Sequence, residues 1–210
     1  MAPAVEAKNP GRLILALDAT MSRQPTWDLA CSLQAEMFDA VGKSRLSVQL
    51  VYFRGFGECR ASRFVDDTAT LKALMTKIDC RGGHTQIGKV LSHALKENER
   101  GKVNAVVYIG DAMEEGIDAL ADKAGQLGLL GVPVFVFQEG RDGAAEIAFR
   151  EIARLSKGAW FRFDGSSAST LSRLLSAVAV YATGGLKALE ARGREGDRLM
   201  LEHLRRGGRT

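Results

Sequence analysis

The chain has 210 residues, 46% of them hydrophobic, and a formal net charge of +4. This length suits one α/β domain with a sizeable core, and no apolar run approaches the roughly 20 residues that span a bilayer, so we expect no membrane association. The N-terminus has no apolar signal-peptide segment and the three cysteines are scattered. Together these features favour a cytoplasmic location.

Apolar runs that end at turn residues predict strands, and periodic apolar positions between them predict helices. The first strand is the continuous run over 13–17, which ends at Asp18 as a strand buried on both faces would. In chain order, the pattern then predicts a helix over 25–41, strands over 46–52 and 58–65, a helix over 71–78, a helix from Thr85 to 95, a strand over 103–109, a helix over 117–127, a strand over 132–137, a helix over 147–155, a strand over 159–163 and a helix over 171–183.

Strands and helices alternate throughout, which predicts an α/β fold. We expect a doubly wound, Rossmann-like and mostly parallel six-stranded sheet with helices on both faces, and residues 58–65 as its edge strand. Thr85 is a suitable N-cap for the helix that it precedes.

The two ends of the chain differ in composition from the part between them. Residues 1–11 are expected to be a flexible leader, and residues 12–183 the domain. Residues 184–210 form a charged, basic tail, because 186–210 hold seven Lys/Arg and four acids. No continuous apolar stripe runs along this tail, so we expect it outside the core. It also lacks interleaved aromatic residues, so we expect no nucleic-acid partner.

Five oxygen-bearing side chains are predicted to meet at one edge of this sheet: Asp18, Thr20, Ser22, Thr85 and Asp111. Ligands of doubly wound sheets bind beyond the carboxyl ends of the strands, where the winding reverses. In the common strand order 3-2-1-4-5-6, the strands that end at Asp18 and Asp111 are neighbours at that point. Thr85 opens the helix that leads into the second of them.

This set of side chains favours a divalent cation. Two neighbouring carboxylates in a crevice repel each other unless a cation compensates their charge. Hydroxyl and carboxylate oxygens are hard ligands, which suit Mg²⁺ or Mn²⁺ better than zinc. Mg²⁺ keeps coordination positions for water or an incoming group, so the site would accept an external carboxylate.

The loop Asp18-x-Thr20-x-Ser22, followed by Thr85 and then Asp111, resembles the metal-ion-dependent adhesion site (MIDAS) of the von Willebrand factor A (VWA) family. Segments 82–88 (GGHTQIG) and 109–111 (IGD) are similar to the family's surrounding sequences. The resemblance covers about residues 12–183. Thr20 departs from the usual Ser; it keeps the oxygen and adds a methyl group, so we expect metal binding with altered affinity.

The resemblance implies a VWA-type fold and an Mg²⁺-dependent (or Mn²⁺-dependent) protein–protein interaction module without enzymatic activity. The metal ligands would be Asp18, Thr20, Ser22, Thr85 and Asp111. A protein partner would present an Asp or Glu to the ion, and ATPases or chaperone-like proteins are one class of candidate.

An enzyme is the alternative. Asp18, at the end of the first strand, could be the nucleophile of a phosphatase-like hydrolase. That chemistry needs a second acid two residues on for proton transfer, and position 20 is Thr. No GxSxG nucleophile elbow and no phosphate-binding GxxxxGK[ST] loop occurs in the chain.

Several neighbouring residues have two interpretations each. His84 either contacts a ligand or is an exposed loop residue. Glu114 and Glu115 either rim the site or favour the N-terminus of the helix that follows. Trp27 and Phe56 are either exposed contact aromatics or core residues, and core packing is the favoured interpretation.

Overall fold

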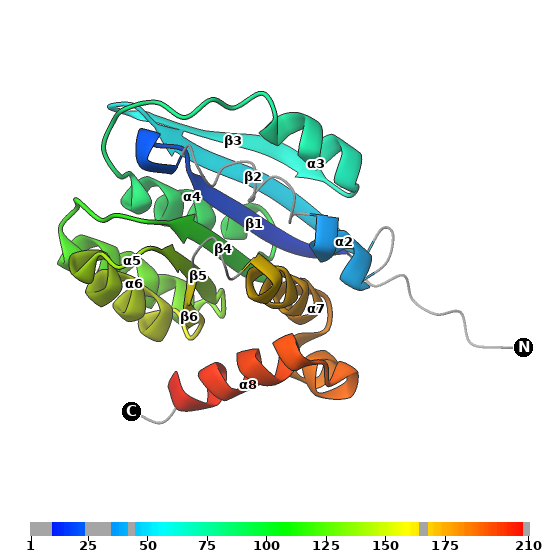
Figure 1. Cartoon of the computed structure of the whole chain (residues 1–210). Coiled ribbons are helices and arrows are strands. Elements are labelled where there is room, and N and C mark those ends of the chain that lie inside the picture. Colours follow the sequence, from blue (N-terminus) through cyan, green and yellow to red (C-terminus); the bar gives the residue numbers. More distant parts are fainter. Residues whose placement is uncertain (1–9, 24–34, 42–44, 164–167, 208–210) are drawn as a thin grey trace, which may run out of the picture.

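A computed structural model of the chain describes residues 10–23, 35–41, 45–163 and 168–207, which form one sheet covered by helices on both faces (Figure 1). Trp27 and most of the helix predicted over 25–41 lie outside these residues. The described elements are β1 (Gly11–Asp18), η1 (Met21–Arg23), α2 (Ala35–Val41), β2 (Leu46–Arg54), β3 (Glu58–Val65), α3 (Thr68–Met75), α4 (Ile87–Arg100), β4 (Ala105–Gly110), α5 (Ile117–Leu129), β5 (Val134–Glu139), α6 (Gly143–Leu155), β6 (Ala159–Phe163), α7 (Ala168–Arg192) and α8 (Glu195–Gly207).

The sheet has the strand order β3-β2-β1-β4-β5-β6, which confirms the predicted topology. β1 pairs in parallel with both β2 and β4, whereas β3 is an antiparallel edge strand. The winding therefore reverses between β1 and β4. Leu17 pairs with Ile109 across this junction, so the residues that follow each strand leave the sheet side by side.

The central strands are buried on both faces, which explains their uninterrupted apolar sequences. Every residue of β4 is buried, as is nearly all of β1. One core cluster packs against α2, α3, α7 and α8, and the other against α4, α5 and α6. Both helix layers are visible in Figure 1, where α2 and α7 lie on one side of the sheet.

The C-terminal residues fold onto the domain, which differs from the appendage expected of 184–210. α7 continues to Arg192 through Gly185, whose φ of 66° turns the helix axis. Leu189 on α7, and Met200 and Leu201 on α8, are buried in the same core cluster. The change of direction at Gly185 explains why no continuous stripe is visible in the sequence: the apolar positions belong to two helical segments with different axes. The division at residue 184 itself stays a prediction.

A buried ion pair joins these last two helices. Arg192 donates to both carboxylate oxygens of Asp197, at 2.8 and 2.6 Å, and Asp197 is completely buried. The same carboxylate accepts from the backbone N–H of Arg194 at 2.9 Å. Some of the charged residues of the predicted basic tail, Arg192 and Asp197, therefore fix α8 against α7.

α7 is the one described helix that is long and apolar enough to cross a membrane by length and composition. Here it is a core helix, because its apolar residues pack against the sheet and against α2. Its composition therefore reflects burial inside the domain.

Candidate metal site

The loop after β1 gathers three of the five predicted donors. The backbone N–H of Thr20 donates to Asp18 Oδ1 at 2.8 Å, and the hydroxyls of Thr20 and Ser22 lie 3.2 Å apart. The N–H of Arg23 donates to the carbonyl of Thr20 at 3.0 Å, which closes the short helix η1. Asp18 and Thr20 are buried, whereas Ser22 is exposed. The loop thus runs from the floor of a site to the surface.

This loop is fixed to its neighbours through Ala19. The N–H of Ala19 donates to the carbonyl of Phe53 at 3.0 Å, and its carbonyl accepts from the N–H of Arg81 at 3.0 Å. Thr20 also forms an isolated parallel bridge with Arg81. The segment that leads to Thr85 is therefore held against the Asp18 loop by backbone hydrogen bonds.

Asp111 follows the end of β4 and lies within electrostatic range of Asp18. Asp18 is completely buried, and burial raises its pKa from 3.8 to about 6; the nearby charge of Asp111 adds to this rise, while hydrogen bonds from Thr20 and the charge of Arg23 oppose it. The predicted meeting of the two strand ends therefore occurs. Its electrostatic result is a carboxylate that is costly to ionise without a cation.

Arg23 is the cation that the sequence analysis missed. Its side chain is almost completely buried and forms an ion pair with Glu139 at the end of β5. Burial lowers the pKa of its guanidinium, and the charges of Asp111 and Asp18 raise it. Arg23 thus supplies part of the positive charge that the two aspartates need, yet the pKa of Asp18 remains raised.

Thr85 lies on the loop before α4, the second loop of the site. It is held by the connection between β4 and α5, the third loop, which also carries Asp111. Its hydroxyl accepts from the N–H of Glu114 at 3.0 Å, and the Glu114 carboxylate accepts from the N–H of Thr85 at 3.0 Å. Glu114 lies three residues after Asp111 in the β4–α5 connection, so this reciprocal pair of hydrogen bonds fixes Thr85 to the loop that carries Asp111. All five predicted donors therefore sit on three loops at the carboxyl edge of the sheet.

The expectation that Thr85 caps the helix is wrong. α4 begins at Ile87, after Gln86, which makes no side-chain capping bond. Glu115 takes that role, because its carboxylate accepts from the N–H groups of Ile87 and Gly88 at 2.6 and 2.9 Å. A negative charge at a helix N-terminus is favourable. Glu115 provides it for α4, not for α5 that follows it in the chain.

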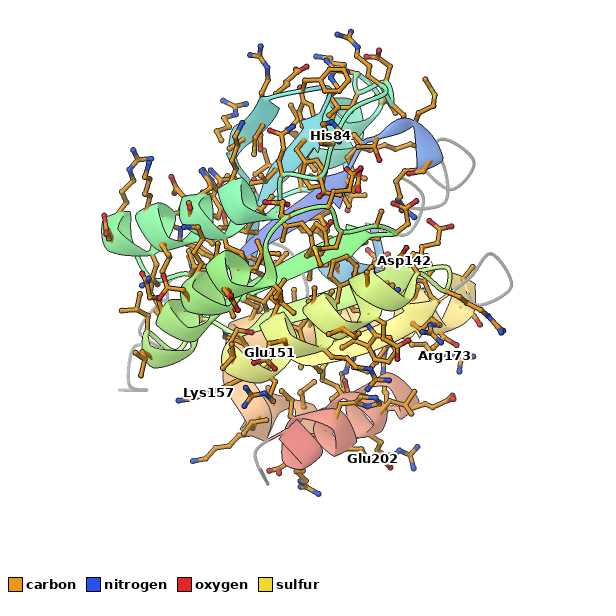
Figure 2. All side chains as sticks on the ribbon, turned by 90° about the vertical axis from the view of Figure 1, so that its left-hand side faces the viewer. His84, Asp142, Glu151, Lys157, Arg173 and Glu202 are labelled. Atoms are coloured by element: carbon orange, nitrogen blue, oxygen red, sulfur yellow. The ribbon has the colours of Figure 1, made fainter. Side chains whose placement is uncertain are left out.

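The expected core packing of Phe56 is also wrong. Phe56 is 84% exposed at the turn between β2 and β3, and its ring meets that of His84 edge-on at 5.2 Å. His84 is exposed too, and its Nδ1 lies 3.2 Å from the Glu114 carboxylate. Figure 2, which views the side of the molecule at which β1 ends, shows His84 on the surface of its upper part.

The donor set fits a hard divalent cation. Asp18 Oδ2 and Asp111 Oδ1 are buried and have no hydrogen-bond partner among the described residues. The nearby Tyr108 hydroxyl is also buried and has no hydrogen-bond partner among the described residues. Burial, together with the charges of Asp18 and Asp111, raises the pKa of Tyr108. Buried polar atoms normally have partners, and a bound cation would give the two carboxylate oxygens one. The described residues contain no group of three His, Cys, Asp or Glu placed for a metal, so hydroxyl oxygens would have to complete the ligand set of a cation here.

Sequence comparisons find no counterpart: no protein-family model matches the chain, and no curated protein matches it significantly. Structural comparisons do. An aerotolerance-related membrane protein from Bacteroides fragilis, solved with multiple mutations to serine, gives a TM-score of 0.61 at 17% identity, covering 93% of this chain and 98% of that one.

Two further solved structures have the same architecture. The SpRpn10 VWA domain gives a TM-score of 0.61 at 10% identity and covers 77% of this chain and 95% of that one. Proximal thread matrix protein 1 from the mussel byssus, with a zinc-occupied MIDAS motif, gives a TM-score of 0.62 at 19% identity. The match covers 81% of this chain and 45% of that one. At these identities the likeness shows the fold alone, and it confirms the fold predicted from the sequence.

Proposed function

We propose that this chain, which has the fold of von Willebrand factor A domains, is a protein-interaction module that binds a partner carboxylate through a divalent cation, Mg²⁺ or Mn²⁺. The observation that carries the proposal is the pair of buried carboxylate oxygens, one on Asp18 and one on Asp111, that have no hydrogen-bond partner within the described ranges of the chain. A divalent cation would satisfy both oxygens and remove the repulsion between the two groups.

The five donors would divide the work by charge. Asp18 and Asp111 would supply negative charge from the floor of the site, directly or through water. Thr20, Ser22 and Thr85 would supply neutral hydroxyl oxygens. When bound, the cation supplies a coordination position that attracts an external Asp or Glu, because few of its ligands are charged. The exposed Ser22 marks the side on which that group would enter.

Phosphatase-like chemistry at Asp18 is less well supported. A nucleophile must reach its substrate, but Asp18 is completely buried and its Oδ1 accepts the Thr20 N–H at 2.8 Å. Position 20 lacks the acid that would protonate a leaving group. We therefore propose a non-enzymatic role, in the cytoplasm, and a protein partner for which ATPases and chaperone-like proteins are candidates.

Replacing Ser22 by Ala tests the cation site with little effect on the fold. Ser22 is exposed, and its one described side-chain contact is with Thr20. We expect the Mg²⁺ affinity measured by calorimetry to fall about tenfold, and the free energy of unfolding in EDTA to stay within about 0.5 kcal/mol of the parent value. Identical Mg²⁺ titrations of the two proteins would remove Ser22 from the ligand set. If the parent protein itself gave no heat with Mg²⁺ or Mn²⁺, the proposed function would be wrong.

Stabilisation by Mg²⁺ should depend on pH through Asp18. Its pKa in the folded protein is raised to about 6, above the ordinary 3.8, so without the ion its contribution to stability declines as pH rises from about 4 to 6. Mg²⁺ binding needs the ionised form, so the affinity should rise over the same window and level off above it. The difference in melting temperature between Mg²⁺ and EDTA should therefore vanish near pH 4.5 and reach its plateau near pH 7.

Melting curves from pH 4.5 to 8 measure this difference. In a His84→Gln variant, the pH at which half of the Mg²⁺ effect has developed should be unchanged. This result would assign the pH dependence to Asp18 and not to the neighbouring imidazole of His84. A Mg²⁺ effect that is constant between pH 5 and 8 would contradict the assignment of Asp18 to the ion.

A further inference from the structure

Phe56 contacts the ring of His84, the residue before Thr85, and the exposed Met21 lies between Thr20 and Ser22; we call these three side chains, each next to a proposed ligand or in contact with its neighbour, the apolar rim. We propose that the partner segment carries a large apolar side chain within about three residues of the carboxylate that binds the cation, and that this side chain packs on the apolar rim. The inference rests on the proposed function and adds the chemistry of the partner to it.

The exposure of the apolar rim is unusual for this protein. Met21 is 57% exposed and Phe56 is 84% exposed. Met21 lies between the proposed ligands Thr20 and Ser22, and Phe56 contacts the residue before Thr85. The described part of the chain has four other exposed large apolar residues, and these lie on or at the ends of helices: Leu129, Leu130, Ile147 and Leu186.

Phe56 is held in place by the same loops that hold the site. The carbonyl of Gly55 accepts from the N–H of His84 at 3.2 Å, and the Gln86 amide donates to the carbonyls of Arg54 and Gly55 at 3.2 and 3.4 Å. On the other side of Phe56, the Lys89 ammonium group donates to the carbonyl of Gly57 at 2.9 Å. The turn therefore holds the backbone that carries Phe56 at a fixed place relative to Thr85.

An exposed aromatic ring on a well-anchored turn is well suited to binding. Burying the apolar surface of a Phe side chain favours association, and a turn whose backbone is already ordered loses little entropy when a partner covers it. Interface residues with the largest effects are typically aromatic and surrounded by polar groups. The Glu114 carboxylate, which lies beside His84 and accepts from the N–H of Thr85, provides a polar group on this side.

The partner that fits is a protein segment in extended conformation. The cation takes one carboxylate, and side chains on one face of an extended strand recur about every 7 Å, so an apolar residue on the same face would lie beside the carboxylate and be free to contact the apolar rim. The exposed carboxylate of Glu114 beside Thr85 disfavours a ligand with several negative charges, such as a phosphate chain. Among the described residues near the site, the exposed apolar surface of Met21 and Phe56 is also small for docking onto a lipid surface.

Peptide display tests the inference. A library of random nine-residue peptides would be selected on the intact protein in Mg²⁺, and bound peptides released with EDTA. We expect the released sequences to combine an Asp or Glu with Leu, Ile, Met or an aromatic residue at a preferred spacing. A synthetic peptide from the selection should bind at least tenfold more weakly to Phe56→Ala. Replacing its apolar residue by Ala should cost affinity on the parent protein and little more on Phe56→Ala.

Leu129→Ala is the matched control, because Leu129 is 86% exposed at the end of α5 and should leave binding unchanged. Acidic peptides with no apolar preference, bound equally by Phe56→Ala, would overturn the role of the apolar rim and leave the cation site standing. An absence of EDTA-released acidic peptides would overturn both the apolar rim and the proposed function.

Discussion

An Asp18→Asn variant should melt at a higher temperature than the parent protein in EDTA and should gain no further stability from Mg²⁺. The first effect follows from the raised pKa of Asp18, about 6 instead of 3.8, which makes its ionised form unfavourable in the folded protein at neutral pH. At 1.36 kcal/mol per pH unit, the penalty is at most about 3 kcal/mol. The Asn side chain keeps an oxygen for the N–H of Thr20 and removes the charge that faces Asp111.

The second effect follows from the loss of a charged ligand, which should weaken Mg²⁺ binding by at least about a hundredfold. Thermal melts with Mg²⁺ and with EDTA at pH 7.5 measure both effects. Asp118→Asn is the control, because Asp118 is an exposed acid in the first turn of α5 and should change neither quantity by much. An Asp18→Asn protein less stable than the parent in EDTA would show that the ionised carboxylate stabilises the loop without a cation.

A Gly83→Ala variant should lose both stability and cation affinity, whereas the adjacent Gly82→Ala should lose neither. A Cβ added at Gly83 would lie 2.1 Å from the carbonyl oxygen of Gly55, and no flexible side chain can move aside to relieve this contact. At Gly82 the same atom would meet nothing within 4 Å. The two substitutions add the same methyl group at neighbouring positions, so their difference isolates the contact between the two loops.

Relief of that contact requires the β2–β3 turn to separate from the loop that carries Thr85. We expect a loss of about 2–4 kcal/mol in the free energy of unfolding, from overpacking together with the hydrogen bond between His84 N–H and Gly55. Mg²⁺ affinity should fall at least tenfold because Thr85 moves. Urea denaturation and calorimetry measure the two losses. Equal behaviour of the two variants would mean that the loops separate without cost.

The sequence predicted the parts of the site that follow from topology. Asp18 and Asp111 end neighbouring parallel strands, and strand order alone brings them together. Contacts between side chains and distant loops were beyond reach. Nothing local indicates that Glu115 caps α4 or that Glu114 holds Thr85, although the two acids lie only three and four residues after the predicted Asp111. Arg23 was missed because a charged residue in a polar loop normally faces water.

The C-terminal helices show a different limit. Their apolar residues are visible in the sequence, but the periodicity of a single straight helix does not describe them, because Gly185 changes the helix direction. Phe56 shows a third limit. A Phe in a short turn resembles a core residue by composition, and only the geometry of the turn places its ring outside.

The pairing of β1 with β4 has a consequence for how the protein reaches its folded state. The two aspartates meet only when these strands are side by side, and the residues between them include β2, β3, α3 and α4. Closing such a long loop is slow, and contacts of this kind form late in the folding of parallel sheets. A cation site that forms only after β1 and β4 have paired cannot guide the earlier steps of folding. A bound ion would lengthen the lifetime of the folded molecule without changing the rate at which it forms.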